Sequence, residues 1–311
     1  MNAREPHFTL RTLALLCGAL ELGVALNAAA AEYVVDGSHP QASDVNPGTA
    51  ERPWKSIAMA NKALAPGDTV YIKAGTYGDF IAPEQSGTAA GRITYRNFKD
   101  EQVKIAEAQK GILLVGKSYV TVEGLSFSHL DEFMRLEQAS HNAIVRCVFS
   151  QMRKRSQWAG ARIWKDSQYN TLRQCSFSKW GWYTDDDKGC LLDIGNENSK
   201  VEQTAYNLIE GCEFFHGGHH LVGVYSKCNV FRNNYFHNEN WLKDDAGKNL
   251  WGNRNLMTSG FDECSGRNLF EGNRVAFSGY PRTTTAPQGW ACLRAGISCA
   301  STASTGTTRP G

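Results

Sequence analysis

The sequence predicts an all-β fold, a right-handed parallel β-helix, from three observations: a repeated phrase, its period, and a two-residue alternation within it. The phrase is an Asn, an apolar residue two positions on, a Cys or Asn five positions on, and an aromatic residue seven positions on. It reads NAIVRCVF, NTLRQCSF, NLIEGCEF and NVFRNNYF from Asn142, Asn170, Asn207 and Asn229, with a weaker copy at Asn268 and an Asn-less forerunner at Val120. A phrase that recurs at this period indicates stacked units, each too small to bury its own apolar face.

The spacing of the phrase gives the strand arrangement. Successive copies begin 22, 28, 37, 22 and 39 residues apart, so the bare coil has 22 residues and the other steps carry insertions. Within each copy the alternation breaks once and resumes, which indicates two strands joined by a bend. A third strand precedes each copy, at 111–115, 133–136, 160–163, 190–194 and 221–224. Three strands per turn, stacked about 4.8 Å apart, predict a triangular coil.

The inward Asn and Cys positions predict ladders along the stack. Successive Asn amides can hydrogen-bond one another from rung to rung. Cys147, Cys175 and Cys212 form a buried column of thiols in the same way. A metal or redox site is the alternative interpretation, but one buried cysteine per coil is what packing alone produces.

The N-terminal part resembles a known group of secreted proteins. The phrases YVVDGS from Tyr33, NPGT from Asn46, RPWKSI from Arg52, APGDTVYIKAGTY from Ala65 and SGTAAGRITY from Ser86 carry the likeness. They are similar to right-handed parallel β-helix polysaccharide lyases of the family 9 pectate lyase type, and also to the chondroitinase B and alginate lyase type. The resemblance covers residues 33–280. It implies a short capping helix over Ser56–Leu64, whose residues Ile57, Met59, Ala60 and Leu64 suit a cap.

The first residues have the pattern of an export signal. Arg4 and Arg11 precede an apolar stretch over 13–26, and small residues follow at 28–31. We therefore expect a signal peptide at 1–31 and a secreted or periplasmic protein. No other stretch approaches the roughly 20 apolar residues needed to span a bilayer.

The net charge limits the class of ligand, and the cysteine content allows a disulfide. The net charge of +2 is too mild to indicate a nucleic-acid partner and is compatible with an anionic polysaccharide that meets a local basic groove. We expect a monomer. In an oxidising compartment Cys228 and Cys264, which lie outside the ladder, are a candidate disulfide.

Three segments are therefore predicted: the signal peptide at 1–31, a β-helix domain at 32–280 with an N-terminal cap over about 32–80, and an irregular tail at 281–311. The tail is either a flexible extension or the product of a truncated or frame-shifted reading frame. We favour the second interpretation, because a bare last coil would expose strand edges and core.

The insertions predict where a ligand binds. All three are placed between the aromatic that ends one phrase and the strand that begins the next coil, so stacking would align them as one wall. Aromatic faces stack on sugar rings, and cations hold carboxylates. The predicted substrate-binding residues are Arg135, Trp180, Trp182, Tyr225, Trp241 and Trp251. The alternative is that long loops are polar by nature and tryptophans fasten them to the solenoid.

An acidic run suggests a metal. Asp185, Asp186 and Asp187, with Asp193 on the following strand, offer the oxygen ligands that calcium prefers. The resemblance points the same way, because family 9 lyases hold calcium with clustered aspartates. A solvated acidic loop is the competing interpretation.

Catalytic candidates lie in the same region. The run His216-Gly-Gly-His219-His220 presents imidazoles that can transfer protons near neutral pH. β-Elimination from a uronate needs a cation beside the carboxylate and a base for the C5 proton. The predicted catalytic residues are Arg162, Lys165, Lys188, His219 and His220, with Tyr225 as a further candidate base. If their strand stays regular, Arg162 and Lys165 point to opposite faces.

The favoured function is a secreted lyase that acts on an acidic polysaccharide. Two other enzyme classes use this fold: a glycoside hydrolase, for which Asp186, Asp193 and Asp262 are the carboxylates to consider, and a C5-epimerase. A non-catalytic carbohydrate-binding or surface protein is the remaining alternative, because a fold alone does not choose among functions.

Overall fold

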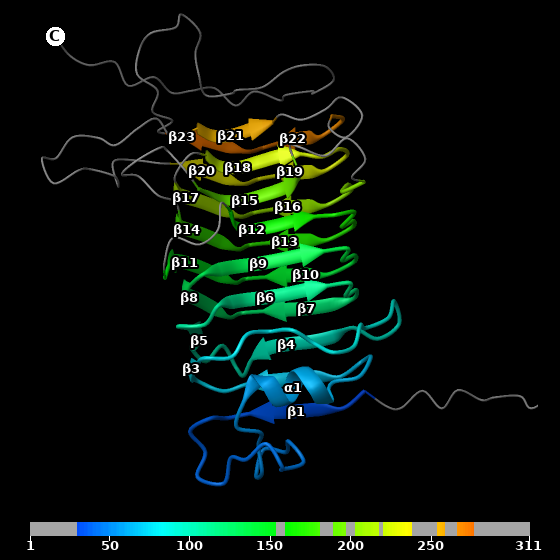
Figure 1. Ribbon diagram of the computed structural model, residues 1–311, viewed down its shortest axis with the longest axis vertical. Helices are drawn as coiled ribbons and strands as arrows, with labels where there is room; N and C mark the ends of the chain where they lie inside the picture. Colours follow the sequence, from blue (N-terminus) through cyan, green and yellow to red (C-terminus); the bar gives the residue numbers. More distant parts are fainter. Residues whose placement is uncertain are drawn as a thin grey trace, which may run out of the picture.

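The computed structural model describes residues 30–153, 159–180, 189–196, 203–217, 220–237, 254–258 and 266–276. Within these residues the strands form three sheets, and every strand pairing is parallel. The sheets run along one stack, with the order of the chain rising from β1 to β23 (Figure 1). The predicted parallel β-helix is confirmed.

The bounds of the strands follow the predicted coils. Sheet A contains, in spatial order, β1 (Glu32–Val35), β2 (Thr69–Ile72), β4 (Ile93–Asn97), β7 (Val120–Glu123), β10 (Ala143–Val145), β13 (Thr171–Arg173), β16 (Leu208–Glu210), β19 (Val230–Arg232) and β22 (Leu269–Glu271). Sheet B contains β3 (Gly75–Tyr77), β5 (Val103–Ala106), β8 (Ser126–Leu130), β11 (Val148–Met152), β14 (Ser176–Trp180), β17 (Glu213–Gly217), β20 (Tyr235–His237) and β23 (Arg274–Ala276). Sheet C contains β6 (Lys110–Val115), β9 (Glu132–Glu137), β12 (Ala159–Trp164), β15 (Cys190–Gly195), β18 (His220–Tyr225) and β21 (Arg254–Thr258).

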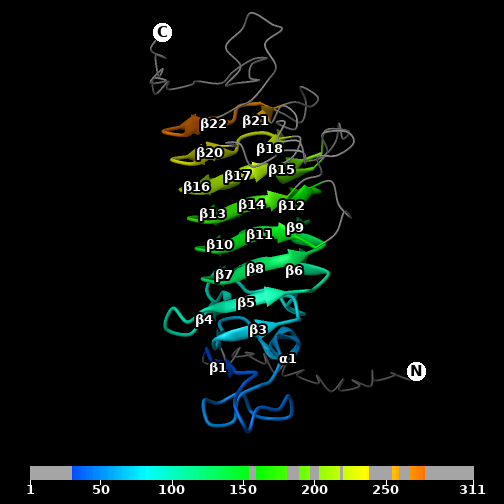
Figure 2. The same cartoon turned by 90° about the vertical axis from the view of Figure 1, so that its left-hand side faces the viewer.

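Each complete coil passes from sheet A to sheet B to sheet C, and the repeated phrase supplies the strands of sheets A and B. The view turned by 90° shows the same order of rungs (Figure 2). The predicted third strand of each coil is a strand of sheet C, in every case from β6 to β18.

A short helix closes the N-terminal end of the stack. Helix α1 (Ile57–Ala63) begins after Ser56, whose hydroxyl accepts a hydrogen bond from the Met59 amide at 3.2 Å. Ile57, Ala60 and Leu64 are buried in the core, and Figure 1 shows the helix beside β1. The predicted cap is therefore confirmed in place, and of its four predicted residues only Met59 is partly buried instead of buried.

The predicted Asn ladder runs through the turn that leads into sheet A. The Asn142 amide group donates to Asn170 Oδ1 at 3.0 Å, and Asn170 donates in the same way to Asn207 Oδ1 at 3.0 Å. The ladder continues from Asn207 to Asn229 and from Asn229 to Asn268, each at 3.0 Å. Each side-chain oxygen also accepts from a backbone N–H of the preceding rung, so a buried turn keeps its polar groups paired.

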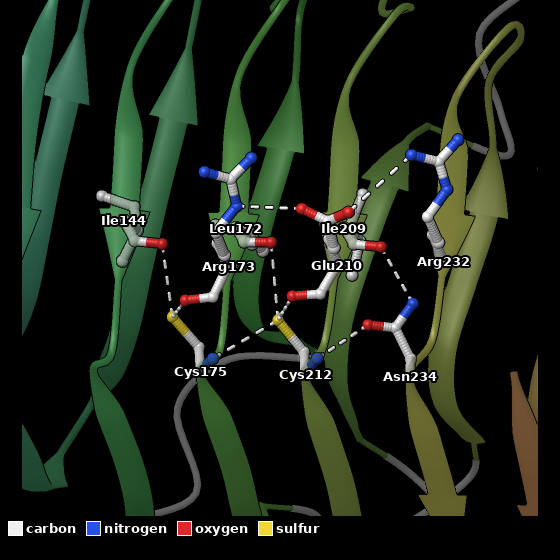
Figure 3. Close-up of polar contacts among 9 residues, drawn as sticks. All are labelled: Ile144, Leu172, Arg173, Cys175, Ile209, Glu210, Cys212, Arg232 and Asn234. Carbon is white, nitrogen blue, oxygen red and sulfur yellow. Dashed lines mark hydrogen bonds and ion pairs between the residues drawn. The ribbon is translucent and has the colours of Figure 1, made fainter. Parts of the chain in front are cut away.

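The Cys positions and the later Asn positions make equivalent bonds (Figure 3). The Cys175 thiol donates to the Ile144 carbonyl of the preceding rung at 3.3 Å, and Asn234 Nδ2 donates to the Ile209 carbonyl at 2.9 Å. The two series meet where the Cys212 backbone N–H donates to Asn234 Oδ1 at 2.8 Å. Cys and Asn can therefore occupy the same position of the phrase because each donates a hydrogen bond to a backbone carbonyl of the preceding rung.

Two thiols of this ladder, Cys175 and Cys212, are held protonated. Burial is the largest cause that raises the pKa of Cys175 and of Cys212 above the ordinary thiol value. Because the thiolate is the metal-binding and nucleophilic form, the packing interpretation of the cysteine column fits the structure better than the metal or redox interpretation.

A column of phenylalanines fills the corner of sheet B. Phe127, Phe149, Phe177, Phe214 and Phe236 stack in series, with ring centroids 4.6–5.2 Å apart. All five are fully buried. Offset stacks of this kind add stability beyond the area that they bury.

The insertions follow the prediction only in part. Those at 153–158, 181–189 and 238–253 lie between sheet B and sheet C, as predicted. Extra residues also lie between sheet C and sheet A, at 196–207 and 259–268. By contrast, the connection of this kind between β18 and β19 has only residues 226–229. The expectation of a single insertion turn is wrong, because the step between phrases does not reveal which of two turns absorbs the added residues.

Several predictions concern residues outside the described ones: the export signal at 1–31 apart from its last two residues, and the tail at 281–311. Cys264 lies there too, so the candidate disulfide between it and the half-buried Cys228 stays a prediction. In the part of the chain that the structure describes, no helix is long and apolar enough to cross a membrane.

Candidate functional site on the outer face of sheet C

The strands of sheet C break the regular alternation near their start. In β9, Phe133 and Met134 are consecutive and both belong to the core. The residues on either side, Glu132 and Arg135, are therefore brought to the outer face, where Arg135 Nε donates to Glu132 Oε1 at 2.9 Å. The same pattern recurs in β15, with Leu191 and Leu192 in the core.

The residue after this pair forms a column along the outer face. Arg135 of β9 is in register with Arg162 of β12, which is in register with Asp193 of β15 and, one rung further, Gly223 of β18. Two cations and a carboxylate thus occupy successive rungs. Predicted residues from three separate coils are brought together here by the register.

Glu132 is an addition that the sequence did not single out. Its side chain is 2% exposed, and Oε2 has no hydrogen-bond partner among the described residues. A buried carboxylate oxygen without a partner is costly. Glu132 therefore joins Arg135 as a second ionisable side chain at this end of the face.

Arg162 lies over an aromatic ring. Its guanidinium carbon lies 4.9 Å from the centroid of the Trp164 ring. Among the described residues no carboxylate lies within ion-pair distance of Arg162, in contrast to Arg135 and Lys165.

Lys165 lies close to the same ring. The strand β12 ends at Trp164, and Lys165 takes a left-handed φ of 49°. Its Nζ is 5.2 Å from the Trp164 centroid and pairs with Glu137. The strand is thus not regular as far as Lys165, and Arg162 and Lys165 share one aromatic neighbour.

Four side chains converge at the next rungs. His220 Nε2 lies 3.2 Å from Asp193 Oδ1, the Cys190 thiol donates to the same oxygen at 3.1 Å, and the Tyr225 hydroxyl is 3.5 Å from His220 Nε2. Cys190 and His220 are fully buried, and Tyr225 and Asp193 nearly so. Cys190 was missed at the sequence level. The signal that could have found it is its place at the start of β15, in register with His220.

The remaining predicted site residues lie outside the described residues: Asp185, Asp186, Asp187, Lys188, His219, Trp182, Trp241, Trp251 and Asp262. Trp180 ends β14, and its side chain is not described. The single wall of aromatic and charged loops, and the roles assigned to these residues, stay predictions.

An aromatic column in the turn between sheet C and sheet A makes a poor sugar platform. Tyr119, His141, Tyr169 and Tyr206 stack with centroids 4.8–5.1 Å apart. Tyr169 and Tyr206 are about half exposed. Because the ring faces are turned toward one another, only the edges are open, and the faces that would stack on a sugar ring are occupied.

Calcium does not fit the donors that the structure describes. Asp193 is the one predicted calcium ligand among them, and its carboxylate faces a thiol and an imidazole. Calcium takes six to eight oxygen ligands. We therefore derive no step of the reaction through calcium, and the aspartate run at 185–187 remains a prediction.

Comparison with known proteins assigns the chain to a family. The family model described as "Pel9A-like, right handed beta helix region" matches residues 38–247. The chain belongs to the Pel9A-like right-handed β-helix family. This confirms the resemblance and the handedness expected from the sequence.

Solved structures agree with this assignment. Pectate lyase Pel9A matches with a TM-score of 0.61 and 18% identity, over 79% of this chain and 63% of Pel9A. A rhamnogalacturonan lyase matches with a TM-score of 0.51 and 15% identity, over 78% and 67% of the two chains. A GH136 lacto-N-biosidase from Eubacterium ramulus has a TM-score of 0.53 and 12% identity, over 78% of this chain and 55% of that one. At these identities the likeness of the Pel9A-like chain to each is one of fold.

One curated relative is similar to this chain over a short stretch. The uncharacterized protein YwoF of Bacillus subtilis (strain 168) is 42% identical over 67 residues, which are 22% of this chain and 14% of YwoF. The Pel9A-like chain therefore spans a small part of YwoF and less than two thirds of Pel9A.

Proposed function

We propose that this protein binds an acidic polysaccharide along the outer face of sheet C and cleaves it by β-elimination. The single observation that carries the proposal is the column in which Arg135 and Arg162 precede Asp193 in register. The lyases among the structural neighbours support the same substrate class. We infer that the protein acts outside the cytoplasm, where such polymers occur.

The arginines suit the carboxylates of a uronate chain. A guanidinium offers a planar fork of donors that matches a carboxylate, and it stays charged at any working pH. Arg162 faces no competing carboxylate among the described residues, whereas Arg135 is paired with Glu132. We therefore assign the principal carboxylate contact to Arg162 and a secondary one to Arg135.

Elimination also needs a base for the C5 proton. A carboxylate neutralised by Arg162 makes that proton more acidic, and a side chain within reach then accepts it. In the described part of the chain, His220, Tyr225 and Lys165 have this capacity. Lys165 shares the Trp164 ring with Arg162, and His220 and Tyr225 lie two rungs further along the stack, on β18. Their separate replacement decides which of them is required.

The proposal is tested on a panel of pectate, alginate and chondroitin. Elimination leaves an unsaturated uronate that absorbs in the ultraviolet, so absorbance should rise with at least one polymer. New reducing ends without this absorbance would indicate a glycoside hydrolase instead. Retained binding with neither product would indicate a carbohydrate-binding protein, and both results contradict the lyase.

A further inference from the structure

Cys190, Asp193 and His220 form a compact group of three different donor types. The Cys190 sulfur and the His220 Nε2 lie 3.1 Å and 3.2 Å from Asp193 Oδ1, and all three donor atoms lie within 4.8 Å of one another. All three residues are buried. They come from two adjacent rungs and belong to neither the thiol ladder nor the arginine pair.

The backbone explains why the group can form. Cys190 and His220 are paired in register at the first residue of β15 and β18. The core pair Leu191 and Leu192 then places Asp193 on the same face as Cys190, as Phe133 and Met134 do for Glu132 and Arg135.

A glycine leaves room beside the donors. A Cβ at Gly223 would lie 2.5 Å from Asp193 Oδ1 and 2.7 Å from His220 Nε2. Real Cβ atoms do not approach so closely, so any side chain here would displace the two donors. In the column Arg135, Arg162, Asp193, this rung carries no side chain, so the donors and the Tyr225 ring, whose Cε2 would lie 2.7 Å from such a Cβ, can close around the glycine.

The donor set decides which metal suits the site. Zinc takes thiolate, imidazole and carboxylate ligands, with bonds of about 2.0–2.3 Å, so donors that share one zinc lie roughly 3–4 Å apart. A thiolate and an imidazole favour transition metals over calcium and magnesium, which prefer oxygen. Three protein ligands leave one tetrahedral position for a water or a substrate oxygen.

We propose that Cys190, Asp193 and His220 bind a divalent transition metal of the zinc type. Without metal, the thiol and the imidazole share the Asp193 carboxylate through hydrogen bonds. Metal binding replaces these bonds and releases the thiol proton. The metal would stand between β15 and β18, of which β15 is one rung from Arg162. It would remove His220 from the candidate bases, leaving Tyr225 and Lys165.

The test is titration of the metal-free full chain with Co²⁺, followed by displacement with Zn²⁺. Binding through Cys190 should produce a thiolate-to-cobalt charge-transfer band and the visible bands of four-coordinate cobalt, and zinc should abolish both. Cys190→Ser and His220→Ala should each weaken binding by more than the roughly 10- to 100-fold that loss of an outer-shell partner costs. Gly223→Ala, which keeps all three ligands, should weaken it as well.

Cys228→Ser is the matched control, because Cys228 is a free cysteine outside the group, and its cobalt spectrum should equal that of the parent. A parent protein without the charge-transfer band would overturn the proposal, and so would a band that persists in folded Cys190→Ser. Circular dichroism of each variant establishes that it is folded. No polysaccharide is present, so the result is independent of the lyase proposal.

Discussion

The turn into sheet A keeps the same residue type from coil to coil, whereas the outer face of sheet C does not, although both occur once per coil. In the turn, Asn142, Asn170 and Asn207 repeat because each rung must make the same buried hydrogen bonds. On the outer face, the equivalent position changes from Arg162 to Asp193 to Gly223. In a solenoid, repetition marks what packing requires, and departure from repetition marks where packing leaves the choice of residue open to chemistry.

The largest expected effect comes from breaking the repeated interior. Phe177→Ala removes the central ring of the phenylalanine column and should lower the free energy of unfolding by about 3–5 kcal/mol. Urea denaturation measures it. Val148→Ala, on the exposed side of β11, is the control and should change stability by about 0.5 kcal/mol or less. Equal losses in the two variants would contradict the packing argument.

The equivalence of Cys and Asn can be tested in the ladder itself. Cys175→Asn introduces the group that Asn234 already presents, so stability should change by about 1 kcal/mol or less. Cys175→Asp places a carboxylate among carbonyl oxygens and should cost several times more, since a buried charge without a partner is expensive. Similar melting temperatures for the two variants would show that the hydrogen bonds are not equivalent.

The outer face should respond in ligand binding and not in stability. Arg162→Ala should weaken binding of a uronate oligomer about 10- to 100-fold, the value of a charge-assisted hydrogen bond. Arg173→Ala is the control, because Arg173 lies on sheet A and pairs with Glu210, and it should bind as the parent does. Isothermal titration measures both. Unchanged affinity in Arg162→Ala would remove the proposed carboxylate contact.

A smaller effect should appear at alkaline pH. Burial raises the folded-state pKa of Cys175 and Cys212 above the ordinary value of 9.0. Their stabilising contribution is therefore complete below that value and is lost as pH rises above it, because the unfolded chain gives up the thiol protons first. At pH 10 the loss should be about 1–2 kcal/mol for each thiol.

Denaturation at pH 8 and pH 10 measures this loss. The double variant Cys175→Asn, Cys212→Asn should lose less stability between the two pH values than the parent. An identical loss would assign the effect to other groups, such as Tyr95, whose pKa burial also raises.

The sequence by itself determined the solenoid, the bare coil, the Asn and Cys ladders and the capping helix over Ile57–Ala63. These features depend on local alternation and on bonds that each coil repeats, so a single chain displays them as a period. It also selected Arg162, Asp193 and His220 as candidates from their residue types.

Only the tertiary structure decided which of these side chains meet. The register between rungs brings Arg135, Arg162 and Asp193 into one column, and the paired core residues of β15 place Cys190 beside Asp193. Turns that absorb insertions change the spacing along the chain but not the stacking, so the sequence distance between two residues does not reveal which residues of neighbouring rungs come into register. Cys190 and Glu132 were missed for this reason. Each contacts the residue three positions on, Asp193 and Arg135, because two consecutive core residues lie between them.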